Sequence, residues 1–223
     1  MRPFAVFDLD DTLVDSTAAA DRWLVQLVDS RGLGPDALEF LRAEAASPAT
    51  PQVSFTNIIT KFGFTESWRD LRDAFAEGVP RLARPLDGVL SGLRDLRERG
   101  WRQALLTNGT AVDQLPKLGG GLLDLFDVVC YAEDEVAPKP DPAVFRLVAE
   151  RAGADLDGAW MVGDSLENDV AGGAAVGMRT LWISHGARVP EVGPRPDVVV
   201  ATPAEAFAVL AAGAGRGGHE QGH

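Results

Sequence analysis

Short apolar runs alternate with amphipathic stretches along most of this chain. Apolar runs of this length are typical of strands in a parallel sheet covered on both faces, and apolar residues with a 3.6-residue period indicate helices. The pattern predicts strands at residues 4–9, 103–106, 128–131, 160–162, 180–183 and 198–200. It predicts helices at residues 89–99, 142–152, 168–175 and 204–211. This order of elements favours an α/β fold built from repeated βα units around a parallel sheet.

Residues 16–85 break the alternation, because they show helical periodicity and no convincing strand. Residues at helical spacing include Trp23, Leu24, Leu27 and Val28, and later Leu71, Ala74 and Phe75. The proline-containing stretch 47–51 interrupts the region, and Pro80 and Pro85 are expected to mark its end. We therefore predict an all-helical domain at 16–85, inserted into a discontinuous core of residues 1–15 and 86–212. Residues 213–223, with His219 and His223, are expected to form a disordered tail.

Composition narrows the possible partners and compartments. The formal net charge of −12 over 223 residues argues against a nucleic acid partner, because phosphate backbones are bound by clustered Lys and Arg. The single cysteine, Cys130, lies in an apolar run and is expected to be a buried structural thiol. We see no signal peptide and no apolar run of the roughly 18 residues that a membrane span requires. A cytoplasmic protein without membrane contact is the expectation.

Two carboxylates, Asp8 and Asp10, follow the first predicted strand. Strand geometry places residues two apart on one side, and ligands of open α/β sheets bind at the carboxyl ends of strands. Carboxylates held this close repel each other, and a divalent cation removes that repulsion. Oxygen ligands of this kind suit Mg²⁺. An acidic turn that merely ends a strand is the alternative interpretation.

Two further stretches could bind a phosphoryl group. Thr107, Asn108 and a glycine follow the second strand, and such a turn can direct backbone N–H groups and a hydroxyl at a phosphate, although an ordinary helix cap would look similar. Lys139 has prolines on both sides and is one of only three lysines, the others being Lys61 and Lys117. A cation on a stiff backbone is suited to stabilising phosphoryl charge.

A fourth stretch adds two more carboxylates. Asp164 follows the apolar run 160–162, so it is expected at the carboxyl end of another strand. Asp169 lies five residues later, near the start of a predicted helix, where it could reach the same point or simply cap that helix. Gly172, Gly173 and Gly177 are expected to let this helix pack closely on the sheet.

Taken in this order, the four stretches resemble the motifs of the haloacid dehalogenase superfamily, and residues 172–178 resemble its phosphoglycolate-phosphatase-like members. The resemblance implies a three-layer, Rossmann-like α/β core with a parallel sheet and an all-helical cap inserted after the first motif. It implies that Asp8 attacks phosphorus to form an aspartyl phosphate, while Asp10 acts as general acid and then general base. It also implies that Thr107, Asn108 and Lys139 bind the phosphoryl group. Mg²⁺ would be held by Asp8, the Asp10 carbonyl and Asp164. Asp169 is placed with this metal group, as a partner of Lys139 or of metal-bound water.

The predicted function is therefore Mg²⁺-dependent hydrolysis of a small phosphomonoester, such as a sugar phosphate, phosphoglycolate or a nucleotide. Family members that attack carbon need no second acid at the position of Asp10 and no metal cluster, so the residues present favour phosphorus chemistry. A phosphomutase remains an alternative, since it differs mainly in how the cap closes. A catalytically silent binding protein is the other alternative. Such a protein could lose Asp8, Asp10 or Lys139 without penalty, and the presence of all three disfavours it.

Overall fold

The computed structural model describes residues 2–213, and in this range six parallel strands form one sheet. Its order is β3-β2-β1-β4-β5-β6, so β1 lies in the middle and pairs with β2 and β4. All six predicted strands are present: β1 (Phe4–Phe7), β2 (Arg102–Thr107), β3 (Val128–Tyr131), β4 (Trp160–Gly163), β5 (Arg179–Ile183) and β6 (Val198–Val200). The first strand is two residues shorter than predicted. The chain turns there because the Leu9 carbonyl accepts hydrogen bonds from the N–H groups of Leu13 and Val14.

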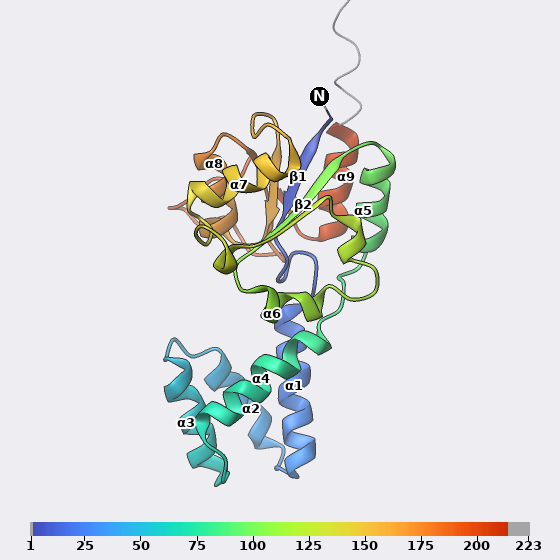
Figure 1. Ribbon diagram of the computed structural model, residues 1–223. Coiled ribbons are helices and arrows are strands. Elements are labelled where there is room, and N and C mark those ends of the chain that lie inside the picture. Colours follow the sequence, from blue (N-terminus) through green and yellow to red (C-terminus); the bar gives the residue numbers. More distant parts are fainter. Residues whose placement is uncertain (1, 214–223) are drawn as a thin grey trace, which may run out of the picture. The chain divides into compact units, whose positions relative to one another are not determined.

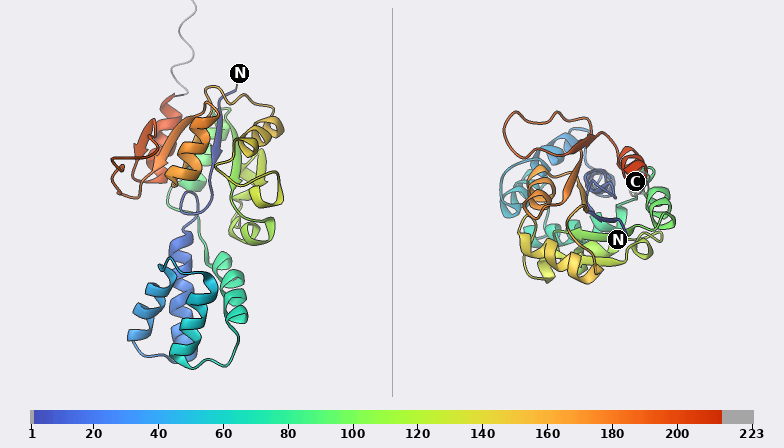
Figure 2. Two further views of the ribbon diagram at one scale, coloured as in Figure 1. Left: turned by 90° about the vertical axis from the view of Figure 1, so that its left-hand side faces the viewer. Right: turned by 90° about the horizontal axis from the view of Figure 1, so that it is seen from above.

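Helices cover both faces of this sheet (Figure 1; Figure 2). On one face lie α5 (Val89–Glu98) and α9 (Pro203–Gly213), which contact each other. On the other face lie α7 (Pro142–Ala152) and α8 (Gly172–Ala175). This arrangement confirms the predicted three-layer α/β core. Because α9 includes Gly213, assigning that residue to the tail is wrong. Residues 214–223, including His219 and His223, lie outside the described residues.

The helix predicted at 168–175 forms as two segments of different geometry. The first, η4 (Leu166–Ala171), is a π-helix, and α8 continues from it. Close packing at Gly173 is confirmed, because a Cβ there would lie 2.8 Å from the Cβ of Met161. For Gly177 the prediction of close packing is wrong, because no atom lies near its missing Cβ. Its φ of 83° shows that the backbone turn before β5 is what favours glycine there.

Four short helical segments follow β2 and β3 that the hydrophobic pattern did not predict. They are α6 (Ala111–Gln114), η1 (Leu115–Lys117), η2 (Leu123–Leu125) and η3 (Ala132–Asp134). Each is three or four residues long, which is too short for a 3.6-residue period to appear in the sequence.

The described residues divide into two compact units, residues 2–15 with 85–213, and residues 16–84. Pro85 belongs to the sheet unit, since it forms a bridge with Val14. The second unit contains α1 (Ser16–Arg31), α2 (Asp36–Ala45), α3 (Pro51–Phe62) and α4 (Trp68–Leu82), packed around Leu24, Leu27, Leu41, Ile58 and Leu71. Pro51 opens α3, but Pro80 lies inside α4 instead of ending it. No helix within residues 2–213 is both long and apolar enough to cross a membrane.

Candidate active site

Asp8 is the first residue after β1 and lies at the centre of the sheet's carboxyl edge. Its backbone N–H donates to the Val162 carbonyl of the neighbouring β4 at 2.9 Å, which fixes its position relative to that strand. The residue is buried, with 7% of its surface exposed. Asp11, in the turn that follows, has a φ of 53°, a left-handed backbone that Asp tolerates better than most residues.

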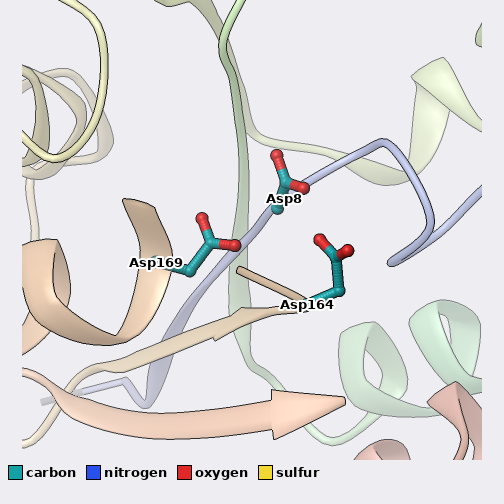
Figure 3. Close-up of side chains that lie close together, drawn as sticks. All are labelled: Asp8, Asp164 and Asp169. Atoms are coloured by element: carbon teal, nitrogen blue, oxygen red, sulfur yellow. The ribbon is translucent and has the colours of Figure 1, made fainter. Parts of the chain in front are cut away.

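Asp164 and Asp169 bring two more carboxylates to Asp8 (Figure 3). Asp164 follows β4, and its carbonyl accepts a hydrogen bond from the Trp182 indole at 2.6 Å. Asp169 is a member of the π-helical segment η4 and is 1% exposed. One oxygen from each of the three carboxylates lies within 4.8 Å of the others. The predicted convergence of Asp8 and Asp164 at one edge of the sheet is therefore what the structure shows.

Lys139 lies between two of these carboxylates. Its Nζ donates to Asp8 Oδ1 at 2.6 Å and to Asp169 Oδ1 at 2.7 Å, and the residue is 4% exposed. The second Asp169 oxygen, Oδ2, accepts the Ser165 backbone N–H at 3.0 Å. Both oxygens of Asp169 are thus engaged with protein donors. The prediction that Asp169 partners Lys139 agrees with this geometry.

Burial dominates the electrostatics of the site. It raises the pKa of Asp8 to about 7, because the attraction of Lys139 offsets only part of the lost hydration and Asp169 adds repulsion. Burial likewise raises the pKa of Asp164 to about 6, helped by repulsion from Asp8. Burial alone would lower the pKa of Lys139, but Asp169 and Asp8 outweigh it and hold that pKa above its ordinary value. Lys139 therefore remains a cation at neutral pH.

The donor set fits a divalent cation with a preference for oxygen ligands. When all three carboxyl groups are ionised, their charge exceeds that of the single ammonium group by two, in a largely buried site. Burying unpaired charge is costly, and the raised pKa values of Asp8 and Asp164 record that cost. All the donors are hard oxygens, which Mg²⁺ prefers. The residues present thus match the ion predicted from the sequence.

Asn108 and Thr107 lie at the carboxyl end of β2. The Asn108 side chain donates to the Lys139 carbonyl at 3.0 Å and accepts the Lys139 N–H at 2.8 Å. Both polar atoms of that side chain are therefore occupied by the backbone of the lysine. Thr107 is 1% exposed, and its hydroxyl makes one long contact of 3.4 Å with the Asn108 carbonyl.

The Asp10 carboxylate points to a different set of partners. Its Oδ1 accepts from Lys117 Nζ at 2.6 Å and its Oδ2 from Gln114 Nε2 at 3.1 Å. The group of three clustered carboxylates within the described residues does not include Asp10. The sequence argument that put Asp8 and Asp10 side by side assumed a strand through Leu9, whereas β1 ends at Phe7.

A family comparison provides independent information about this site. The model of the haloacid dehalogenase-like hydrolases matches residues 4–177, which include each of the seven candidate site residues. The chain belongs to this family of hydrolases. The resemblance noted from its four motifs is thereby confirmed, as is the expectation of an enzyme.

Similar proteins of the haloacid dehalogenase-like family include two curated phosphatases. A glyceraldehyde 3-phosphate phosphatase of Pyrococcus abyssi is 28% identical over 81% of this chain and 80% of its own length. A phosphoglycolate phosphatase of Agrobacterium fabrum is 29% identical over 90% of this chain and 88% of its own. A solved haloacid dehalogenase-type phosphatase of Thermococcus onnurineus is 28% identical, with a TM-score of 0.63 over 94% of this chain and 98% of its own.

Sequence reasoning missed three residues at the site of this hydrolase. Gln114 and Lys117 contact Asp10, and Thr12 is fully buried with its hydroxyl 3.5 Å from Asp164 Oδ1. The scarcity of lysine was the one available signal for Lys117. The exposed His185 also approaches this region, since its Nε2 lies 2.6 Å from the Asp11 carbonyl.

Proposed function

We propose that this hydrolase is a Mg²⁺-dependent phosphatase that cleaves small organic phosphomonoesters through an aspartyl phosphate on Asp8. The observation that carries the proposal is the environment of Asp8. A buried carboxylate oxygen is held 2.6 Å from Lys139 and lies beside two further carboxylates, at the carboxyl edge of the sheet. The names of the two curated relatives, a glyceraldehyde 3-phosphate phosphatase and a phosphoglycolate phosphatase, support phosphoryl substrates of this size.

The first half of the proposed reaction uses Asp8 and Asp10. An Asp8 oxygen attacks phosphorus, the bond from phosphorus to the ester oxygen breaks, and the Asp10 carboxyl group gives its proton to that oxygen. In the second half, the Asp10 carboxylate takes a proton from water, which attacks phosphorus and releases Asp8. Lys139 and the Thr107 hydroxyl would hold the oxygens of the transferring group, and Asn108 would keep the Lys139 backbone in place.

Asp8 and Asp164, with the main-chain carbonyl of Asp10, would hold Mg²⁺. The ion would supply charge neutralisation for the phosphate and would let the two carboxylates ionise together at neutral pH. Asp169 has both oxygens engaged by Lys139 and Ser165, so we assign it mainly to orienting Lys139.

The proposal assigns a different role to each of the two compact units. All seven candidate site residues lie in residues 1–15 and 86–212, which we assign to catalysis. The helical unit, predicted at 16–85 and compact over 16–84, would act as the cap that selects among substrates.

The test is phosphate release from a panel of phosphomonoesters, with Mg²⁺ or with a chelator. The variant is Asp8→Asn, and the matched control is Asp155→Asn, an exposed carboxylate on the loop before β4. We expect Mg²⁺-dependent turnover by the wild type and the control, and a loss of at least about 10³-fold in Asp8→Asn. Retained turnover in Asp8→Asn would contradict the covalent mechanism. A folded wild type that releases phosphate from no ester would contradict the phosphatase and favour the phosphomutase or the binding protein.

A further inference from the structure

Two side chains from the segment after β2 hold the Asp10 carboxylate, one on each oxygen. Lys117, the last residue of η1, donates to Oδ1 at 2.6 Å, and Gln114, the last residue of α6, donates to Oδ2 at 3.1 Å. One donor on each oxygen fixes both the position and the plane of a carboxylate. These contacts join parts of the chain that are about a hundred residues apart in sequence, so only the fold brings them together.

The Gln114 amide has one orientation that suits its neighbours. The residue is 5% exposed, and its Nε2 also donates to the Asn108 carbonyl at 2.8 Å. Its Oε1 is buried and has no hydrogen-bond partner among the described residues. Turning the amide over would point this oxygen at two acceptors, Asp10 and the Asn108 carbonyl. The contacts of Nε2 with two acceptors therefore set the orientation of this amide.

The backbone leaves room for the Gln114 side chain at one point. Gly109 has a φ of 129°, and a Cβ at this position would lie 2.7 Å from Gln114 Nε2. Any larger residue would push the amide away from Asp10. Gly109 therefore serves the approach of Gln114 as well as the left-handed turn.

Lys117 makes a partly shielded ion pair with Asp10. Its side chain is 11% exposed and that of Asp10 is 34% exposed. An ion pair removed from water to this extent holds its geometry better than one on the open surface. Since the chain has only three lysines, two of them, Lys117 and Lys139, lie at the site.

The contacts form one continuous path through the site. Lys117 contacts Asp10, Asp10 contacts Gln114, Gln114 contacts Asn108, and Asn108 clamps the backbone of Lys139. Lys139 in turn bonds to the nucleophile Asp8. The placement of the acid–base group is thus mechanically coupled to the placement of the phosphoryl-binding lysine.

We propose that Lys117 and Gln114 are positioning residues that aim the Asp10 carboxyl group at the leaving-group oxygen. This inference rests on the proposed phosphatase function. A carboxyl group offers about four lone-pair sites, so one donor on each oxygen is compatible with a proton on the same group. When the bond from phosphorus to the ester oxygen breaks, its electron pair goes to that oxygen and the proton follows from Asp10. If the Asp10 carboxyl group were misplaced, the leaving ester oxygen would remain an unprotonated alkoxide.

The inference predicts a dependence on the leaving group that a merely structural role would not give. An alkyl phosphate must expel a strongly basic alkoxide and needs the proton from Asp10. An activated aryl phosphate, such as p-nitrophenyl phosphate, expels a stable phenolate and needs it far less. Positioned proton transfer contributes about 10²–10⁴-fold to a rate. Loss of positioning should therefore slow alkyl ester hydrolysis much more than aryl ester hydrolysis.

The experiment compares kcat and KM on p-nitrophenyl phosphate and on the best alkyl phosphate of the panel. The variants are Lys117→Met, Gln114→Met and Lys117→Arg, and the control is Arg99→Met, which removes a cation from the exposed ion pair with Asp95. We expect Lys117→Met and Gln114→Met to lower kcat on the alkyl ester at least about tenfold more than on the aryl ester. Lys117→Arg should recover part of the loss, and Arg99→Met should match the wild type.

Three outcomes would overturn the inference. Equal losses on both esters would indicate structural damage, and a rise in KM alone would assign Lys117 to substrate binding. Unchanged kinetics in both methionine variants would show that neither Lys117 nor Gln114 positions Asp10.

The thermal midpoint of each variant shows whether it folds. If one variant does not fold, the kinetics of the other two variants test the inference. If the wild type turns over neither ester while Mg²⁺ is present, the phosphatase proposal fails and this inference fails with it. Suppose instead that the wild type is active and Asp8→Asn is not. The inference alone is then overturned if the Lys117 variants keep the wild-type ratio of kcat on the alkyl ester to kcat on the aryl ester.

Discussion

Asn108 and Lys139 exchange two hydrogen bonds, at 3.0 Å and 2.8 Å, between the side chain of one and the backbone of the other. The pair joins the loop after β2 to the loop before α7. Because the amide uses its donor and its acceptor on the same residue, it fixes the direction from which the Lys139 side chain reaches Asp8.

The substitution Asn108→Ala removes both hydrogen bonds and should release the Lys139 loop. We expect a loss of kcat of about 10²-fold, since a displacement of about 1 Å in a positioning group can cost that much. Steady-state kinetics with Mg²⁺, accompanied by the thermal midpoint, measures the effect. Asn57→Ala is the matched control, as that asparagine contacts Glu44 in the exposed part of the helical unit. Equal kinetics in both variants would show that the clamp is dispensable.

A side chain at Gly163 would collide with Asp169, because the Cβ of an alanine would lie 2.1 Å from Asp169 Oδ2. Gly163→Ala should therefore displace the carboxylate that holds Lys139, and overpacking of this kind costs about 1–3 kcal/mol of stability. Gly119→Ala is the control, since no atom lies near its missing Cβ and its φ is not positive. Denaturant unfolding and phosphatase activity of both variants check the prediction. A Gly163→Ala protein with normal activity would contradict the assigned role of Asp169.

Mg²⁺ should stabilise the folded chain even when no substrate is present. An ion at a concentration 100 times its Kd adds about 2.7 kcal/mol to the free energy of unfolding. We expect the thermal midpoint of the wild type to rise with Mg²⁺ and to fall when a chelator is added.

The variant Asp164→Asn separates ion binding from nonspecific salt effects. Without Mg²⁺ it should be at least as stable as the wild type, because it removes repulsion toward Asp8. With Mg²⁺ it should gain little. Asp155→Asn should respond to the ion as the wild type does. An equal Mg²⁺ response in Asp164→Asn would place the ion elsewhere.

Cys130 should be unreactive in the folded protein at neutral pH. The residue is fully buried, and burial raises the pKa of its thiol to about 11, with repulsion from Glu135 adding to the shift. At pH 8 only about 0.1% of such a thiol is ionised, and the thiolate is the reactive form. Because the folded pKa exceeds the unfolded one, the thiol favours folding at low pH, and this contribution falls as the pH rises from about 9 to about 11.

The measurement for Cys130 is the rate of reaction with dithiodipyridine at pH 8, before and after unfolding in urea. We expect reaction in urea to be faster by a factor of at least about 10². Rapid reaction of the folded protein would show that β3 opens or that Cys130 is accessible.

The sequence by itself determined the sheet, the helical insertion and the placement of most of the site. Apolar runs of strand length predict all six strands because both faces of a parallel sheet are buried, so each strand must be apolar on both sides. Polar residues that follow such runs must lie at one edge, since parallel strands share a direction. Asp8, Thr107 and Asp164 could be assigned to a common site for this reason alone.

Only the tertiary structure decided how the polar side chains pair. The segment after β2 folds into turns too short for a periodic pattern, so nothing in the sequence linked Gln114 or Lys117 to Asp10. The end of β1 at Phe7 separates Asp10 from the three clustered carboxylates, although strand geometry had placed it beside Asp8. Hydrogen bonds between residues far apart in sequence depend on distances and directions that arise only after the chain has packed, which is why local patterns do not encode them.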